Sequence, residues 1–333
     1  MIDIVLLAFL VGVAVAIVYM KDLLAVVMLT GIYSLLSASF FVAMDSVDVA
    51  FTEAAVGAGI STLLMLVAIT MTGRSEHPER HKPLLALAVV IVTGSLLIYG
   101  TLDMPYFGSA EAPIHQHVAP RYINDSMQEI GVPNIVTSVL ASYRAFDTFG
   151  EVVVIFTAGI GVLALLSVVR RTEDSSKIES FNTSMHEQHL ILRVVIKMLI
   201  PFILLFAFYV QFHGDFGPGG GFQAGVIFAS AIFLYAMLFG MNTTRRVINQ
   251  SVIKFLAAFG VLLYGSVGVV SLLNGKNFFD YSALSSDPVA GQHLGILLIE
   301  LGVGLTVASV MVIIFFNFVG RRDISQMKEK KDI

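Results

Sequence analysis

The sequence predicts an all-α, polytopic membrane protein with about nine transmembrane helices, on the evidence of its composition and of its apolar runs. Of the 333 residues, 56% are hydrophobic and only 13% are charged, a balance far from that of soluble domains. Apolar runs of about 20 residues, the length that an α-helix needs to cross a bilayer, recur along the whole chain. The strands of a membrane β-barrel would be shorter and would alternate in polarity.

Nine spans follow from these runs. Met1–Met20 lacks a basic n-region and a clear cleavage site, so we interpret it as the first span and not as a signal peptide. Basic residues gather in the connections after the odd-numbered spans, which predicts an N-terminus outside and a C-terminus in the cytoplasm. The predicted spans are 2–20, 23–44, 49–72, 84–102, 147–169, 190–212, 222–241, 252–275 and 294–320.

Two long connections divide the chain. The outer one, about 103–146, becomes helical at Asn134 and gathers its apolar residues on one face, which predicts a helix on the outer membrane surface that leads into the fifth span. The inner one, Thr172–Gln188, is charged and rich in Ser, as linkers are. We therefore expect a three-span module at 1–82, a two-span module at 83–171, a cytoplasmic linker at 172–189, and a four-span domain with a basic tail at 190–333.

Acidic side chains inside predicted spans are the first candidates for function. A charged side chain near the bilayer centre costs ~2.5–3.5 kcal/mol on insertion scales, so such residues are rare and are usually functional. Glu53, Glu151 and Glu300 each lie in a span and are each followed by small residues and glycines, which let neighbouring helices approach closely. This pattern favours a path for protons or cations over a substrate pocket.

Two of these carboxylates also have a structural interpretation. Glu53 lies close to the predicted start of its span, where a carboxylate stabilises a helix N-terminus, and Glu151 follows Asp147 near the start of another. Glu300 lies deeper in its span, and there the functional interpretation is favoured. Asp48 and Asp147 are retained beside the three glutamates as candidates for ion translocation.

Lys197 and the turn between the sixth and seventh spans are further candidates. Either the Lys197 ammonium group reaches the interface by snorkelling, or it is buried and paired with a carboxylate. The turn, HGDFGPGGGFQAG, begins at His213, for which a structural hydrogen bond is favoured over a catalytic role. It is not a P-loop, because no Lys-Ser or Lys-Thr follows its glycines. Glycines permit unusual backbone angles and close packing; those expected to be structural are Gly57, Gly59, Gly219, Gly220 and Gly221.

Other chemistry has little support in the sequence. His115 with His117, and His186 with His189, have the spacing of metal ligands but no acidic cluster beside them, so solvated interfacial histidines are favoured. The chain has no Cys, which excludes disulfides, thiolate metal sites and a Cys nucleophile. No catalytic triad, nucleotide-binding loop or haem ligation is indicated. We expect no cofactor and no enzymatic activity.

Three stretches resemble one family, the Mrp-type multisubunit cation/proton antiporters. Residues 1–73, with DVAFTEAAVGAGISTLLML, resemble the module at the C-terminal end of the large A subunit, which in membrane-bound hydrogenases is a separate small subunit. Residues 84–170, with YRAFDTFGEVVVIFTAGIGV, resemble the companion two-span module of the same complexes. Residues 190–320, with FHGDFGPGGGFQAGVIFASAI and ELGVGLTVASVMVI, are similar to the Mrp B subunit. The resemblance implies a B subunit fused to modules that other subunits usually carry.

The resemblance implies a membrane subunit of a Na⁺/H⁺ antiporter in the bacterial cytoplasmic membrane. Its partners would be large antiporter-like subunits and small membrane subunits, and its transported ions Na⁺ and H⁺; without the large subunits the chain would not transport. Glu53 and Glu151 match positions that serve ion transfer, and Glu300 matches less closely. The family relationship to respiratory complex I implies a distorted third helix, at Val56–Ile60.

Two alternatives stay open at the level of the sequence. The chain could be the equivalent subunit of a membrane-bound hydrogenase or of another redox complex related to complex I. It could also be a structural scaffold, in which case exchanging the three glutamates for glutamine would leave activity unchanged.

Overall fold

The computed structural model describes residues 2–76, 83–106, 108–166 and 190–329, and within these ranges it contains helices, loops and one isolated β-bridge, but no strand. The predicted linker at 172–189, with His186 and His189, lies outside the described residues. The described ranges hold nine helices that are long and apolar enough to cross a membrane, which confirms the predicted fold class. They are Ile2–Tyr19, Leu23–Ala43, Val47–Thr70, Leu84–Thr101, Ala145–Leu166, Ile191–His213, Gly221–Phe239, Gln250–Leu273 and Pro288–Val319.

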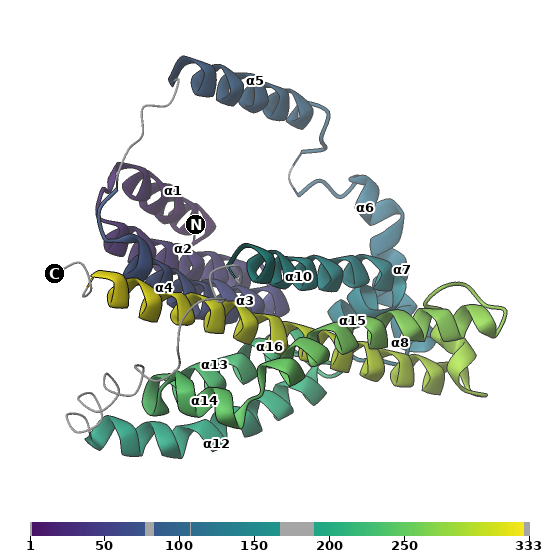
Figure 1. The fold of residues 1–333 in the computed structure, drawn as a ribbon. Coiled ribbons are helices and arrows are strands. Elements are labelled where there is room, and N and C mark those ends of the chain that lie inside the picture. The colour runs from purple at the N-terminus through teal and green to yellow at the C-terminus, as the bar shows by residue number, and fades with distance from the viewer. Residues whose placement is uncertain (1, 77–82, 107, 167–189, 330–333) are drawn as a thin grey trace.

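The first three spans form a group of their own (Figure 1). They are α1 (Ile2–Tyr19), α2 (Leu23–Ala43) and a composite helix of α3 (Val47–Glu53), the π-helix η1 (Ala54–Ser61) and α4 (Thr62–Thr72). Asp22 caps α2 by accepting a hydrogen bond from the Leu24 amide, and its carboxylate lies 2.7 Å from the Arg74 guanidinium. The hydrogen bond from Arg74 lowers the pKa of the Asp22 carboxyl and ties the start of the second span to the end of the third.

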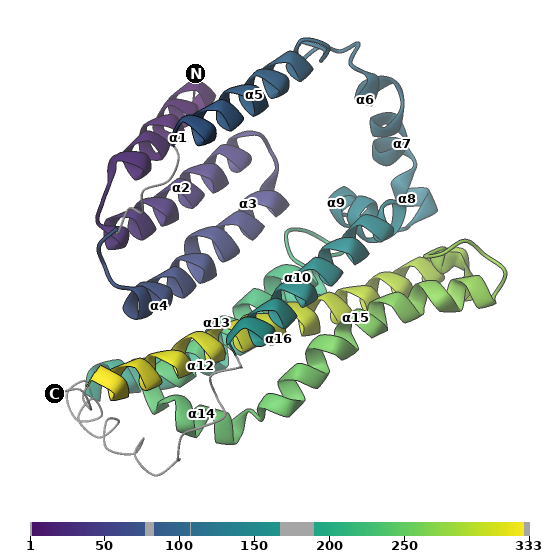
Figure 2. The same ribbon diagram turned by 45° about the horizontal axis from the view of Figure 1, so that its top comes forward.

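The fourth span, α5 (Pro83–Thr101), stands apart from the other helices in Figure 1, while in the turned view of Figure 2 one of its ends overlaps α1. From Leu84 to Thr101 every residue is exposed except the half-buried Gly94. Within the described ranges, α5 therefore buries almost no apolar surface against the rest of the chain.

The outer connection forms a series of short helices: α6 (Pro113–Gln116), α7 (Val118–Asn124), α8 (Ser126–Glu129), α9 (Ile135–Thr137) and the π-helix η2 (Ser138–Tyr143). Asn134 caps α9 by accepting from the Val136 amide at 3.0 Å, so this helix begins where the sequence predicts. Thr137 and Ser138 are buried while Ile135 and Leu140 remain exposed. The helix leads into α10 (Ala145–Leu166), the fifth span.

The last four spans form the most closely packed part of the molecule. They are α12 (Leu190–His213), α13 (Gly221–Phe239), α15 (Gln250–Leu273) and α16 (Pro288–Glu329), joined in part by the short helices α14 (Met241–Val247) and η5 (Tyr281–Leu284). The helix α16 begins several residues before the predicted span. Proline is favoured in the first turn of a helix, and the Asp287 carboxylate accepts from the Val289 amide, so the helix starts ahead of the apolar run.

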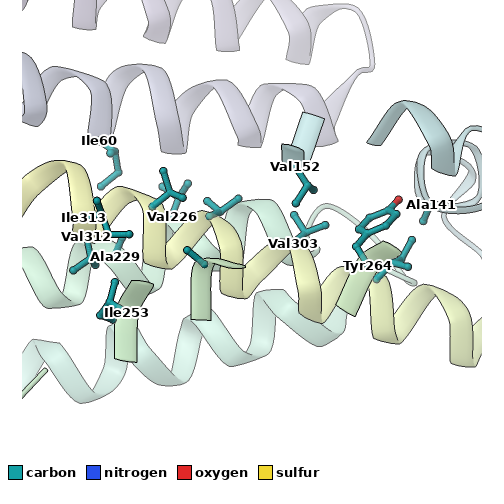
Figure 3. Packing of buried hydrophobic residues seen from close by; sticks show 14 of the residues in the cluster. Ile60, Ala141, Val152, Val226, Ala229, Ile253, Tyr264, Val303, Val312 and Ile313 are labelled. Atoms are coloured by element: carbon teal, nitrogen blue, oxygen red, sulfur yellow. The ribbon is translucent and has the colours of Figure 1, made fainter. Parts of the chain in front are cut away.

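The core lies where α16 packs against α13, α15 and α10, and Figure 3 shows part of it. Glycines let these helices approach closely: a Cβ on Gly225 would lie 2.8 Å from the Gly304 carbonyl oxygen. Ile60 of η1 belongs to the same cluster (Figure 3), and η1 packs against α13. The third span therefore packs against the four-span group, through η1 on α13 and through α4 on α16.

Candidate functional site

Glu53 is the last residue of α3, at the point where the α-helix becomes the π-helix η1. A Cβ on Gly57 would lie 2.7 Å from Glu53 Oε1 and 2.5 Å from Ser34 Oγ of α2. The carboxylate and the hydroxyl therefore share the space that the missing side chain leaves. Because the composite helix begins at Val47, the first turn holds Asp48 and not Glu53. The structure thus disagrees with the interpretation of Glu53 as a capping residue.

The π-helix covers the segment where the resemblance implies a distortion. The Thr62 hydroxyl donates to the Gly57 carbonyl five residues earlier, at 3.2 Å. Short π-helical segments within α-helices occur frequently at functional sites. Of the two predicted structural glycines here, Gly57 has no room for a side chain. Gly59 is exposed, and a Cβ there would meet only the Ala54 carbonyl at an ordinary 3.7 Å.

The glycine turn after α12 holds Glu300 of α16 on one side. Glu300 Oε1 would lie 3.0 Å from a Cβ on Gly214 and 3.1 Å from one on Gly220, whose φ is +108°. A Cβ on Gly221 would overlap the Glu300 carbonyl group, and one on Gly219 would lie 2.7 Å from the Val210 carbonyl oxygen. The absence of side chains in this turn is therefore what lets α13 and the half-buried Glu300 meet.

Asn134 and Thr137 form hydrogen bonds with the glycine turn on the side away from Glu300. The Asn134 side-chain amide donates to the carbonyl oxygens of Gly214 and Gly217, each at 3.1 Å, and to Asp48 Oδ1 at 3.3 Å. The Thr137 hydroxyl donates to the Gly214 carbonyl at 2.6 Å. Asp48 thus lies where the third span, the outer connection and the turn meet through polar contacts. The sequence predicted Asp48 as a candidate but did not predict its partners.

Glu151 and Asp147 lie on α10 and are both exposed. Asp147 is paired with Arg144, three residues earlier, at 2.5 Å; exposed pairs of this kind stabilise a fold little. Tyr264 of α15 is fully buried, donates to the Ala145 carbonyl at 2.9 Å, and lies within electrostatic range of both Glu151 and Glu300. Sequence reasoning missed Tyr264, since a tyrosine in an apolar span gives no distinctive signal.

Lys197 and His213 make contacts of a structural kind. Lys197 is exposed, with its Nζ 5.3 Å from the centre of the Phe239 ring, and none of the described carboxylates lies within ion-pair distance of it. Both the snorkelling and the pairing interpretations of Lys197 stay predictions. The His213 ring stacks on Tyr209 at 4.8 Å, and its Nε2 would lie 3.1 Å from a Cβ on Gly217.

The described candidates for metal ligands, His115 and His117, are not part of a cluster of possible ligands. His115 and His117 are exposed on the outer connection. Among the residues that the structure describes, no three His, Asp or Glu side chains gather as they would around a metal ion.

Comparison with known proteins identifies three consecutive family matches. Residues 191–313 match a domain related to the MnhB subunit of Na⁺/H⁺ antiporters, residues 8–74 match MbhD, the D subunit of MBH, and residues 84–182 match MbhE, its E subunit. Gln223 and Glu300 lie in the first of these matches and Glu53 in the second.

Two relatives illustrate how the matches combine. A probable A/B subunit of a K⁺/H⁺ antiporter from Rhizobium meliloti is 25% identical over 321 residues, which cover 87% of this chain and 31% of the relative. The chain thus spans about a third of that relative. A putative antiporter subunit mnhB2 of Staphylococcus aureus is 34% identical over 143 residues, which cover 41% of this chain and 99% of the relative.

Two solved structures have a similar fold. A chain in the structure of the Mrp complex from Dietzia sp. has a TM-score of 0.75 and 25% identity, with 94% of this chain and 34% of that chain covered. A chain of the archaeal membrane-bound sulfane sulfur reductase has a TM-score of 0.53 and 28% identity, with 72% of this chain and 98% of that chain covered. With a relative matched over nearly its whole length at 34% identity, the chain belongs to the MnhB family of antiporter subunits.

Proposed function

We propose that this protein is an integral subunit of a multisubunit monovalent cation/proton antiporter of the bacterial cytoplasmic membrane. Its relatives are named as antiporter subunits, and a similar chain belongs to an Mrp complex. The transported ions are Na⁺, or another monovalent cation, and H⁺. The partners are the large antiporter-like subunits and small membrane subunits of the complex.

The observation that carries the proposal is the environment of Glu53. Its carboxylate lies inside a span, beside the Ser34 hydroxyl, at the transition from α-helix to π-helix. A carboxylate in such surroundings is stabilised either by a proton or by a nearby cation. Alternating between these two states would let Glu53 exchange one ion for the other, with Glu300 and Glu151 as further members of the same ion path.

We also propose the module boundaries 1–82, 83–171 and 190–333, with 172–189 as a cytoplasmic linker and the N-terminus outside. The three family matches fall one in each of these modules, although the MbhE match, residues 84–182, extends into the linker. In this arrangement the first two modules and the B-subunit domain share one chain, whereas the matching D and E subunits of MBH are named as separate subunits.

The test is ion exchange by the complete complex in everted membrane vesicles. Glu53→Ala is expected to abolish Na⁺-driven proton movement while the complex still assembles, and Glu111→Ala, at an exposed carboxylate of the outer connection, is expected to exchange normally. Normal exchange by an assembled Glu53→Ala complex would contradict a role for Glu53 in transport.

The alternative of a redox complex has one specific observation in its favour. The chain matches the D and E subunits of MBH and nearly the full length of a chain of the sulfane sulfur reductase. The match to the MnhB subunit of antiporters favours antiport. Purifying the complex distinguishes the two, because a redox complex would contain bound iron–sulfur clusters that are visible by absorption and electron paramagnetic resonance.

A further inference from the structure

Gln223 links the four-span group to the third span through a single hydrogen bond. It lies in the first turn of α13 and is only 7% exposed. Its Nε2 donates to the Thr52 hydroxyl of α3 at 2.7 Å. Thr52 immediately precedes Glu53, so this bond joins the four-span group to the helix that carries the candidate carboxylate.

The hydroxyl of Thr52 determines which way the Gln223 amide faces. Thr52 Oγ1 donates its only proton to the Asp48 carbonyl, at 3.0 Å, and can therefore only accept a hydrogen bond from Gln223. The amide nitrogen must point toward Thr52. The amide oxygen, Oε1, must then point away from it.

The freed oxygen lies near Glu300. A Cβ on Gly220 would lie 3.8 Å from Gln223 Oε1 and 3.1 Å from Glu300 Oε1, so the two oxygens border the same small space beside a glycine. Within the described ranges, neither oxygen accepts a hydrogen bond from another side chain or from the backbone. Neither oxygen is among the described buried side-chain atoms that lack a partner, so solvent reaches both, and two acceptors that border one space can both contact a single positive ligand.

We propose that Glu300 and Gln223 Oε1 form one binding site for a transported cation, either a proton on Glu300 or a monovalent metal ion between the two oxygens. The proposal rests on the proposed function and deepens it. Carboxylate and amide oxygens are the ligands that hard cations prefer. Asp215 in the turn and Tyr264 on α15 are the titratable groups within electrostatic range of Glu300.

The same geometry gives Thr52 a role. By holding the amide nitrogen, it fixes Oε1 toward Glu300, and it couples the occupation of this site to the position of the helix before Glu53. Thr52 and Gln223 are therefore positioning residues that make Glu300 and Glu53 members of one path. Glu151 makes none of these contacts with Gln223, Thr52 or Glu300 among the described residues.

The test compares three variants of the complete complex in proteoliposomes, with the concentrations of Na⁺ and of protons at half-maximal exchange measured separately. Gln223→Leu removes Oε1, and Thr52→Val removes the acceptor that orients it. Gln292→Leu is the matched control, because Gln292 is also buried and also makes one hydrogen bond between elements, with the Ser142 hydroxyl at 2.7 Å.

Gln223→Leu is expected to raise the half-saturating concentration of one of the two ions roughly tenfold, because the bound ion loses one of its two ligand oxygens. The ion whose value shifts is the ligand of the site. Thr52→Val is expected to shift the same ion, and the double variant to shift it no further, since both act through one bond. Gln292→Leu is expected to change neither concentration.

The outcomes separate this inference from the proposed function. Unchanged half-saturation for both ions in an assembled Gln223→Leu complex, or equal shifts in Gln292→Leu, would overturn the Glu300–Gln223 site alone. Where Gln223→Leu lowers the amount of assembled complex, Thr52→Val provides the same comparison. A wild-type complex that shows no cation-driven proton movement would overturn the proposed function itself.

Discussion

The side-chain amide of Asn134 donates to the carbonyl oxygen of Gly214, 80 residues further along the chain, at 3.1 Å. The same side chain also accepts from the Val136 amide as the cap of α9. One residue thus begins a helix and holds the glycine turn against which Glu300 lies.

Replacing Asn134 with Ala is expected to destabilise the protein more than the loss of a helix cap alone. Loss of a cap costs about 0.5–2 kcal/mol, and leaving the Gly217 carbonyl without its side-chain donor adds about 1–3 kcal/mol, while the Gly214 carbonyl keeps the Thr137 hydroxyl as its donor. The measurement is the melting temperature of the purified complex by circular dichroism. Asn249→Ala is the control, because Asn249 caps α15 through the Ser251 amide and does not contact the turn. Equal losses in the two variants would show that the contact with the turn contributes nothing.

The outer connection is expected to make part of the stability depend on acid pH. Tyr143 donates a hydrogen bond to the Glu129 carboxylate, and Arg121 donates a second at 3.2 Å. Both bonds lower the pKa of the Glu129 carboxyl below its ordinary 4.5, and the bond from Tyr143 has the larger effect. A carboxyl with a lowered pKa stabilises the fold above its unfolded-state pKa, and this contribution is lost as the pH falls through the folded-state value.

Tyr143→Phe is therefore expected to lower the melting temperature slightly at neutral pH and to flatten its fall below pH 4.5. Because Glu129 is exposed, the effect is small, roughly 0.2–1 kcal/mol. Tyr122→Phe serves as the control, since Tyr122 packs on the Tyr143 ring, while the described donors to the Glu129 carboxylate are Tyr143 and Arg121. If the wild type and Tyr143→Phe lose stability equally on acidification, the bond to Glu129 does not matter.

The predicted orientation is open to a direct test, because the chain contains no Cys. Single cysteines placed at Glu111 and Glu76, both exposed, are expected to react differently with a membrane-impermeant maleimide. Glu111→Cys should be labelled in intact cells, and Glu76→Cys only in everted vesicles. The reverse pattern would mean that the N-terminus faces the cytoplasm.

The number and position of the spans could be predicted from the sequence, since a bilayer requires about 20 apolar residues and the chain repeats that length. Helix ends are predicted less accurately. α16 begins at Pro288, ahead of its apolar run, because Asp287 caps it, and hydrophobicity carries no information about such caps. The third span begins at Val47, two residues earlier than predicted, although Ser46 makes no side-chain cap there.

The candidate site was predictable only in its charged residues. Glu53 and Glu300 are conspicuous in apolar spans, but Gln223 and Thr52 are neutral, and only their meeting in space gives them a role. The π-helix was expected from the resemblance and not from any periodicity. Lys197 is exposed and lies over the Phe239 ring, and its pairing with a carboxylate stays a prediction.

The isolation of α5 has a consequence for how such proteins can evolve. Since the helix buries almost nothing against the described remainder of the chain, dividing the gene just ahead of Pro83 would cost no packing of α5, and the contacts of the first three spans with the last four would become contacts between two polypeptides. The same surface could then be assembled from separately translated polypeptides. A fused chain of this kind gains a fixed ratio of its parts, which independent genes would have to regulate.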